Sequence, residues 1–345
     1  PITARPKDTL AHVLHLLNYY RLNVLPVTEG TKLLGIITRS DIIRVEAEHL
    51  NGQTKQPVSK SDPSYVVYQT QAPQTGCGRL LVPISNPKTT PALLKMAVAI
   101  AHDRNYEIEC LQIILIPPNQ VTSETAVRIK SSQTLLQHAV LLGQAWRVPV
   151  HTQIRVAHTV SGAILEMIQE RHIDLVLMGW KGTTATPGRV FSKVVDTVIR
   201  QAPCEVVLAK LPEEIRFDRW LVPMAGGPNA QEAIQLLPAL SALSRKPEVK
   251  LCQVFQLEQQ PNTALLEKTA HYLKQHLQGS VKIAPVAANS VAEAIIQYSK
   301  QVQSDVIMVG ASRDRLLRQV MNGNVPEEIA RHSNCTVILV RGAVA

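Results

Sequence analysis

The sequence is poor in aromatic residues and cysteines and has no long apolar run. Phe, Trp and Tyr make up 4% of the 345 residues, too few for the stacking platforms that bind single-stranded nucleic acids. The five cysteines include no C-x-x-C pair and have no histidines at metal-ligand spacing, so we expect reduced thiols and no metal site. Apolar runs such as 110–118 are strand-length, well short of the roughly 18 residues that cross a bilayer, and predict a soluble chain.

Groups typical of catalysis and of nucleic-acid binding are also missing. The histidines lie on different predicted elements without Asp and Ser or Cys at triad spacing, and no paired carboxylates mark a pocket. We therefore expect a protein that is not an enzyme. The net charge of +9 comes from scattered Lys and Arg without a basic run, which argues against a nucleic-acid partner and fits phosphorylated ligands or an anionic membrane surface.

An internal repeat organises the chain from about residue 79 onward. The run at 80–83 returns at 220–223, and the run at 174–179 returns at 305–310, in the same order. A segment rich in Gln, Ser, Pro, Lys and Gly precedes the repeat and is typical of a linker. The predicted parts are a first unit at 1–45, a linker at 46–78, a first copy at 79–211 and a second copy at 217–342.

Each copy alternates short apolar runs with helical stretches. Apolar runs bounded by turns predict strands buried on both faces, and their alternation with helices predicts a parallel sheet with right-handed crossovers. The expected strands lie near 80–84, 107–115, 149–155, 174–178 and 205–210, and near 219–223, 249–255, 281–285, 305–309 and 335–340. We predict an α/β fold of two tandem flavodoxin-like, doubly wound units, each with its own sheet. Such sheets bind ligands at the carboxyl ends of the strands beside the switch point.

A glycine-rich segment follows the fourth predicted strand of the first copy. It has the sequence GWKG over 179–182, continues through 183–191 and meets a predicted helix start at Ser192-Lys193. Glycines let the backbone approach a phosphate, and a helix start offers unpaired N–H groups and a positive dipole end. The alternative is a turn that only connects strand to helix. Trp180 in this loop is expected either to stack on a base or to pack against a neighbouring subunit.

This arrangement resembles the universal stress protein family, whose nucleotide-binding members carry Gly-x2-Gly-x9-Gly-Ser/Thr at this place. The resemblance covers both copies and implies that ATP or another adenine nucleotide is bound. It implies a site in the first copy formed by Ser85, Gly179, Lys181, Gly182, Thr183, Ser192 and Lys193, and one in the second copy formed by Gly310, Ser312, Gly323 and Asn324.

Both copies depart from the family pattern. Ser192-Lys193 stands in place of the final Gly-Ser/Thr of the first copy, and Arg313 stands in place of the second glycine of the second copy. Ser85 and Ala225 occupy the positions where nucleotide-binding members have an Asp after the first strand. These departures leave open a structural dimerisation module with degenerate pockets.

The first unit, with LPV at 25–27 and GIITRSD at 35–41, resembles a CBS motif. In that family the Thr and the Asp, here Thr38 and Asp41, hold the ribose and phosphate of adenosine ligands. The simpler alternative is that Ser40 or Asp41 caps the following helix. CBS motifs work in pairs, which implies a second motif upstream of this chain.

A CBS motif followed by two stress-protein copies resembles the cytoplasmic region of bacterial ClC-type chloride channels. The resemblance implies a regulatory, adenine-nucleotide-sensing region at the cytoplasmic face, a parent protein integral to the cell membrane, and a homodimer. The opening Pro1, without an initiator Met, likewise predicts a fragment of a longer chain. The alternative is a free-standing universal stress protein that binds ATP or AMP.

Overall fold

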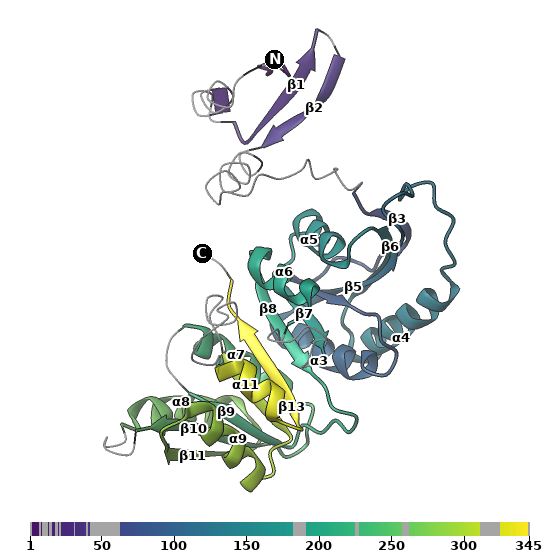
Figure 1. Ribbon diagram of the computed structural model, residues 1–345. Helices are drawn as coiled ribbons and strands as arrows, with labels where there is room; N and C mark the ends of the chain where they lie inside the picture. Colours follow the sequence, from purple (N-terminus) through teal and green to yellow (C-terminus); the bar gives the residue numbers. More distant parts are fainter. Residues whose placement is uncertain are drawn as a thin grey trace. The chain divides into compact units, whose positions relative to one another are not determined.

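Figure 1 shows the computed structural model of the chain. It describes residues 2–6, 8, 13, 16–17, 20, 22–30, 32–38, 41, 63–181, 191–224, 228–256, 262–310 and 325–343. The chain divides into two compact units, Pro1–Ser61 and Asp62–Ala345. None of the helices that the structure describes combines the length and the hydropathy of a membrane span.

The first unit is built on a hairpin. β1 (Val24–Glu29) pairs antiparallel with β2 (Lys32–Thr38). The turn between them contains Gly30 at φ 63°, a left-handed conformation that glycine adopts without strain. Ala4 bridges Val27 in parallel. It also joins a small core with three further apolar residues, Val13, Leu17 and Leu25.

The first copy in the second unit has five parallel strands in the order β6-β5-β4-β7-β8. Its strands are β4 (Gly78–Pro83), β5 (Tyr106–Leu115), β6 (Val150–Ala157), β7 (Leu175–Trp180) and β8 (Glu205–Lys210). Its helices are α3 (Thr90–Arg104), α4 (Lys130–Trp146), α5 (Val160–Arg171) and α6 (Lys193–Gln201). Helix α5 begins after Thr159, whose hydroxyl accepts a hydrogen bond from the backbone N–H of Gly162.

The second copy repeats this arrangement in the order β11-β10-β9-β12-β13. Its strands are β9 (Arg219–Pro223), β10 (Glu248–Phe255), β11 (Ser280–Ala287), β12 (Val306–Gly310) and β13 (Thr336–Arg341). Its described helices are α7 (Pro228–Ser241), α8 (Ala264–His276), α9 (Val291–Gln301) and α11 (Val325–His332). Ser290 caps α9 as Thr159 caps α5, by accepting from the N–H of Glu293. The predicted α/β class with two doubly wound parallel units is confirmed.

Helices cover both faces of the sheet (Figure 1). One core contains residues of α3, α4, α7 and α8, and the other contains residues of α5, α6, α9 and α11. Each core continues from one copy into the other, so that Leu80 and Trp220, at corresponding places of β4 and β9, belong to the same core. The two copies therefore form one body.

The two copies share a single sheet, which corrects our expectation of separate sheets. The last strands of the copies, β8 and β13, pair antiparallel with Leu208 opposite Leu339, and the result is a continuous 11-stranded sheet (Figure 1). Both strands are buried and apolar in their centres and contain no proline. An edge of this kind exposes unpaired N–H and C=O groups, and the antiparallel pairing satisfies the edges of both copies at once.

A cation at the end of each last strand reaches the last helix of the other copy. Lys210 at the end of β8 donates from Nζ to the carbonyl oxygens of Ala330 (2.7 Å) and Ser333 (2.5 Å), at the C-terminus of α11. Arg341 at the end of β13 donates from Nη2 to the carbonyl oxygen of Ala202 (2.8 Å), the residue that follows α6. Because the C-terminus of a helix carries partial negative charge, each copy stabilises a helix end of the other.

An additional strand, β3 (Tyr65–Thr70), pairs antiparallel with the outer edge of β6. It lies inside the segment 46–78 that we predicted to be a linker, and the prediction is wrong for these residues. The sequence YVVYQT is rich in β-branched and aromatic residues, which favour strands. We did not predict this short strand because the residues on both sides of it are polar. We refer to residues 63–77 as the strap.

Candidate functional site

The sheet of the first copy opens where β4 and β7 separate. β4 pairs with β5 along its whole length, whereas its register with β7 covers Leu80↔Leu175 and Leu81↔Val176, in the middle of β4 and at the start of β7. The strand order reverses at this point, since β5 lies on one side of β4 and β7 on the other. In doubly wound sheets a ligand binds in the crevice at the carboxyl ends of two such strands.

The described residues of the predicted first site lie on the elements that flank this opening. They are Gly179 and Lys181 at the end of β7, Ser85 beyond the end of β4, and Ser192 and Lys193 at the start of α6. Gly179 is half-buried and the other four are exposed. Gly182 and Thr183 lie outside the described residues. The topology thus brings residues from three elements to one edge of the sheet.

The start of α6 already uses the Ser192 hydroxyl. Ser192 is the N-cap residue, with extended backbone, and its side chain accepts a hydrogen bond from the N–H of Val195 at 3.4 Å. Lys193 is the first residue of the helix and is exposed. An anion at this helix end would meet backbone N–H groups, the positive end of the helix dipole and an ammonium group.

Trp180 has a structural role within its own domain, so both of our expectations for it are wrong. Its exposed fraction is 7%. Its ring lies 4.8 Å from that of Phe191, centroid to centroid, at an interplanar angle of 44°. Both residues belong to the core under α5 and α6. The indole is therefore part of this core and leaves little ring surface for a base or a neighbouring subunit.

The corresponding place in the second copy is occupied by protein. A Cβ atom on Gly310, the last residue of β12, would lie 2.1 Å from the backbone oxygen of Asn229 in the first turn of α7. The Asn229 side chain accepts a hydrogen bond from Gly342 N at 2.9 Å. On Gly179, by contrast, a Cβ atom would meet the end of the Leu93 side chain at 3.1 Å. Ser312, Gly323 and Asn324 lie outside the described residues.

In the first unit, Thr38 and Asp41 bind one another. The Thr38 hydroxyl donates to Asp41 Oδ2 at 2.7 Å, and the Thr38 backbone N–H donates to the same oxygen at 3.1 Å. The N–H of Asp41 donates back to Thr38 Oγ1 at 3.3 Å. This reciprocal pattern is that of a capping box, with Thr38 as the N-cap. Ser40, the other proposed cap, lies outside the described residues.

Cysteines and acidic residues do not form a metal centre in the part of the chain that the structure describes, where no group of three potential ligands occurs. The five cysteines are free, as predicted. Burial raises the pKa of Cys204 and of Cys335 to about 11, so both are thiols rather than thiolates at neutral pH.

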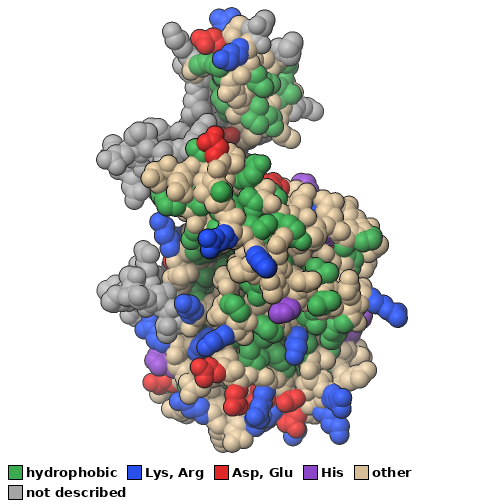
Figure 2. All heavy atoms as spheres, turned by 90° about the vertical axis from the view of Figure 1, so that its right-hand side faces the viewer, with side chains coloured by type: hydrophobic (Ala, Val, Ile, Leu, Met, Phe, Trp, Pro, Cys, Tyr) green, Lys and Arg blue, Asp and Glu red, His purple; other side chains and the backbone are tan. Residues whose placement is uncertain are grey.

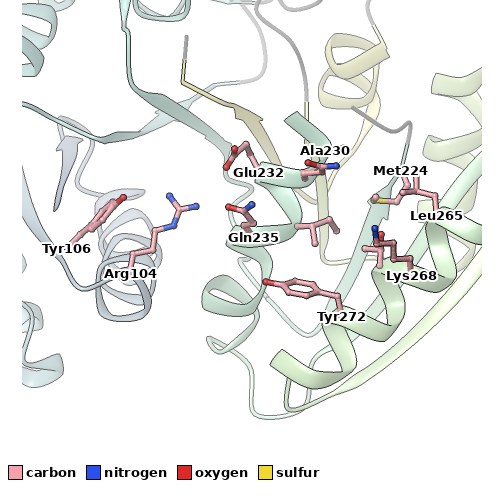
Figure 3. Close-up of a pocket in the computed structure, with 12 residues that line it drawn as sticks. Arg104, Tyr106, Met224, Ala230, Glu232, Gln235, Leu265, Lys268 and Tyr272 are labelled. Carbon is pink, nitrogen blue, oxygen red and sulfur yellow. The ribbon is translucent and has the colours of Figure 1, made fainter. Parts of the chain in front are cut away.

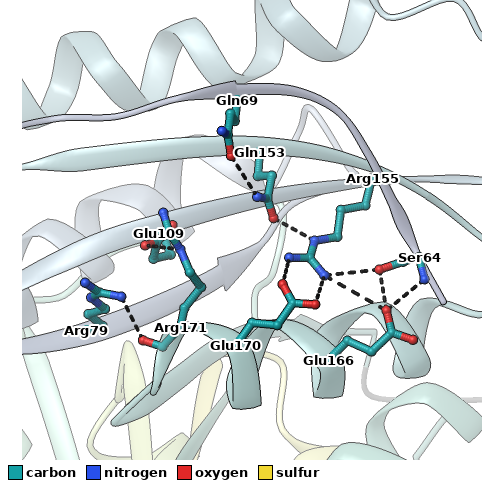
Figure 4. A network of polar contacts seen from close by, with 9 residues as sticks. All are labelled: Ser64, Gln69, Arg79, Glu109, Gln153, Arg155, Glu166, Glu170 and Arg171. Carbon is teal, nitrogen blue, oxygen red and sulfur yellow. Dashed lines mark hydrogen bonds and ion pairs between the residues drawn. The ribbon is translucent and has the colours of Figure 1, made fainter. Parts of the chain in front are cut away.

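A buried polar network that the sequence did not lead us to expect ties the strap to the first copy (Figure 4). Arg155 in β6 is 1% exposed. Its guanidinium donates to Gln153 Oε1 (2.6 Å) and Ser64 Oγ (3.1 Å) and forms an ion pair with Glu170 of α5. Glu166, also on α5, accepts from the N–H of Ser64 at 2.9 Å and from its hydroxyl. The start of the strap is therefore held by both the sheet and a helix.

A second group of contacts holds the other end of the strap. Glu107 Oε1 accepts from the N–H groups of Thr75 (2.7 Å) and Gly76 (2.9 Å), and its Oε2 lies 3.0 Å from His151 Nε2. His151 Nδ1 accepts from the N–H of Ala72, so Nε2 carries the proton and donates it to Glu107. Burial opposes ionisation of Glu107, but these hydrogen bonds outweigh it and lower its pKa.

The sequence did contain a signal for this network. Glu107 and Glu109 alternate with apolar residues in β5, and His151, Gln153 and Arg155 occupy every second position of β6. Charged side chains at every second position of a strand expected to be buried on both faces require partners. That pattern predicts a polar layer on one face of the sheet at this edge.

Comparisons with known proteins agree with this architecture. A model of the universal stress protein family matches residues 77–210 and 216–341, and a model of the CBS domain matches residues 1–48. The crystal structure of a universal stress protein from Archaeoglobus fulgidus is similar with a TM-score of 0.53 at 16% identity, over 78% of this chain and 97% of that one. A functionally unknown protein from Pseudomonas aeruginosa gives a TM-score of 0.50 at 13% identity, over 76% and 92%. These structural likenesses show the fold.

Two curated relatives are similar in sequence. The Na(+)/H(+) antiporter NhaS5 of Synechocystis is 26% identical over 273 residues, which cover 77% of this chain and 39% of the antiporter. This chain thus spans about two fifths of that relative. A universal stress protein of Methanocaldococcus jannaschii is 21% identical over 145 residues, which cover 39% of this chain and 84% of the relative.

Proposed function

This chain belongs to the universal stress protein family over residues 77–210 and 216–341, and on that premise we propose that it is a regulatory region of an ion transporter. We propose that this region binds an adenine nucleotide at the carboxyl edge of its first copy. We propose further that it carries out no catalysis of its own. A hydrolase would need a carboxylate to hold Mg²⁺ and a residue to position water beside the phosphates, and none of the described residues that we place at the opening, Ser85, Gly179, Lys181, Ser192 and Lys193, is a carboxylate.

One observation supports placing the nucleotide site in the first copy. Its switch point is flanked by two exposed lysines and a helix start, while the backbone of Asn229 and Ala230 lies directly against Gly310 at the switch point of the second copy. A phosphate needs space beside the glycine and a positive environment. At Gly179 the neighbouring atom is the movable end of the Leu93 side chain, whereas at Gly310 it is backbone, so we expect one nucleotide per chain in the stress-protein region.

The parent protein is proposed from the relatives. The antiporter NhaS5 is similar over most of this chain, which supports a parent that carries ions across a membrane, with this region at its cytoplasmic face. That similarity favours an antiporter of cations and protons over the ClC-type chloride channel that the domain order suggested. The chloride channel, the second CBS motif upstream and the homodimer stay predictions.

Calorimetric titration of the full chain with ATP, ADP and AMP tests the nucleotide site. We expect Lys193→Ala to weaken binding about tenfold, the loss typical of one ion contact to a phosphate. Arg200→Ala is the matched control, since Arg200 is an exposed cation in the last turn of the same helix. It should leave the affinity unchanged.

The outcomes separate the competing functions. No heat with any nucleotide would favour a structural module with degenerate pockets. Binding that survives Lys193→Ala but is lost in Asp41→Ala would move the site to the CBS motif around Thr38 and Asp41. Release of phosphate from ATP by the purified chain, at a rate that the Lys193→Ala variant lowers, would contradict the proposal that the chain is not an enzyme.

A further inference from the structure

A cavity of about 730 Å³ lies between the two copies (Figure 3). The first copy contributes Arg104, the last residue of α3, and Tyr106, the first residue of β5. The second copy supplies the other walls from α7, α8 and Met224, which follows β9. We call this cavity the interdomain pocket. Its volume lies within the range of about 300–1,000 Å³ that is typical of small-molecule sites.

The interdomain pocket has an apolar floor and a polar rim. Met224 and Ile234 in the floor are 5% and 6% exposed and belong to the core shared by the two copies. At the rim, Gln235 of α7 and Lys268 and Tyr272 of α8 are exposed. In Figure 3, Gln235 and Tyr272 lie between Arg104 on one side and Lys268 on the other. An apolar floor with a few polar groups around it is the usual composition of a ligand site.

Arg104 is fixed in place before any ligand arrives. Its Nη1 donates to Glu205 Oε2 at 2.6 Å, and its guanidinium carbon lies 6.0 Å from the centre of the Tyr106 ring. The bond to Glu205 uses one of five N–H donors, and the guanidinium points toward Gln235 and Glu232 of α7 (Figure 3). Burial opposes the charge on Arg104, but Glu205 outweighs it and raises the pKa of Arg104.

Two cations, Arg104 and Lys268, and one carboxylate, Glu232, line the interdomain pocket. Glu232 lies against the end of β13, because a Cβ atom on Gly342 would be 3.3 Å from Glu232 Cγ. The planar fork of an arginine suits carboxylate, sulfonate and phosphate groups better than a point charge does. We propose that the interdomain pocket binds a small organic anion with an apolar body, its charged group at Arg104 and its body over Met224 and Ile234.

This site is distinct from the nucleotide site proposed above. Arg104 ends a helix and Tyr106 begins a strand, so both lie at the amino edge of the first copy's sheet, whereas Gly179 and Lys193 lie at the carboxyl edge. Residues of both copies line the interdomain pocket, so a ligand there contacts both copies at once.

Fluorescence titration of the full chain with two probes tests the proposal. The first probe is 8-anilinonaphthalene-1-sulfonate, an aromatic anion, and the second is N-phenyl-1-naphthylamine, a neutral compound of similar shape. We expect Arg104→Lys, which keeps the charge beside Glu205 but removes the fork, to weaken binding of the sulfonate about fivefold to tenfold. Binding of the neutral probe should change less than twofold.

Gln235→Trp places a bulky side chain in the mouth of the interdomain pocket and should abolish most of the binding of both probes. Gln297→Trp on α9 and Arg200→Lys on α6 are the matched controls, since both residues are exposed and lie away from the pocket. Both controls should bind the probes like the unmodified chain. Thermal unfolding of each variant shows whether it is folded.

Two results would overturn the proposal. The first is equal affinity for the sulfonate in the unmodified chain and in Gln235→Trp, because the probe would then bind elsewhere. The second is an equal loss of affinity for the sulfonate and for the neutral probe in Arg104→Lys, because the pocket would then have no preference for anions. If Gln235→Trp fails to fold, Arg104→Lys decides the question.

Discussion

The two copies have one topology but differ at two places. At the carboxyl edge, the backbone of α7 fills the space beside Gly310, whereas Gly179 faces the end of a Leu93 side chain. At the outer edge of the sheet, all of β6, which pairs with β3 of the strap, is buried, whereas most residues of β11 are exposed or half-buried. No described strand pairs with the outer edge of β11.

Only the second difference arises from chain outside the repeat, because the strap precedes the first strand of the first copy. The first difference lies within the second copy, where Asn229 of α7 also accepts a hydrogen bond from the N–H of Gly342. The outer strand of the second copy is adapted to solvent, since Lys282 and Pro285 in β11 discourage pairing with another strand. The two copies thus differ in one contact inside the repeat and in one segment that flanks it.

The largest expected effect concerns the two glycines at the switch points. Gly310→Ala should lower the free energy of unfolding by about 3 kcal/mol, because the new methyl group would overlap the rigid backbone of α7. Gly179→Ala should cost less than about 1 kcal/mol, because the Leu93 side chain can move. Urea unfolding of both variants checks this. Equal losses would show that the two switch points are equally closed.

The outer strands give the next effect. Arg155→Ala should lower the free energy of unfolding by about 2 kcal/mol, since it leaves Gln153 and Ser64 without a donor, while Glu170 is half-exposed and regains water. Hydrogen exchange of the β3 amides should rise in this variant.

The control in the second copy is Val286→Ala. Val286 occupies the position along β11 that Arg155 occupies along β6. The variant should lower the free energy of unfolding by less than about 1 kcal/mol, because Val286 is only half-buried. Unchanged exchange of the β3 amides in Arg155→Ala would show that the network does not hold the strap.

We call the antiparallel pairing of β8 with β13 the seam between the copies. The two cations at its ends should contribute equally to the free energy of unfolding. Lys210→Met and Arg341→Met should each cost about 1–2 kcal/mol, because each removes a cation from the C-terminus of a helix in the other copy. The two residues lie four positions apart along the seam, roughly 13 Å, so the losses in a double variant should add. A strongly asymmetric pair of values in urea unfolding would argue against a reciprocal seam.

The smallest effect is on pH dependence. The lowered pKa of Glu107 stabilises the folded chain above the ordinary pKa of glutamate, about 4.3, and this contribution is lost as pH falls through the lowered value. Glu107→Gln should therefore lose about 0.5–1 kcal/mol at neutral pH and show a shallower loss of stability on acidification. Glu248→Gln, at the matching position of β10 and exposed, is the control and should keep the slope of the unmodified chain.

Much of the fold could be predicted because it depends on local patterns. Apolar runs such as 80–83 and 220–223 became β4 and β9, and their repetition gave two parallel units. The site residues were placed less completely. Ser85, Lys181 and Lys193 do flank the opening, but the Ser192 hydroxyl caps α6 and Trp180 is buried against Phe191. Which polar group turns toward a ligand and which toward its own backbone depends on the path of a few residues, and spacing does not specify it.

The sequence by itself determined the two α/β units and the edge at which a ligand could bind, because hydrophobic period and turn chemistry act over a few residues. Tertiary structure alone decided that β8 and β13 join the copies into one sheet, that the strap closes the edge of β6, and that α7 fills the second switch point. Each of these pairs groups far apart along the chain, and the free energy of such a contact depends on shape, exposed edges and desolvation in three dimensions.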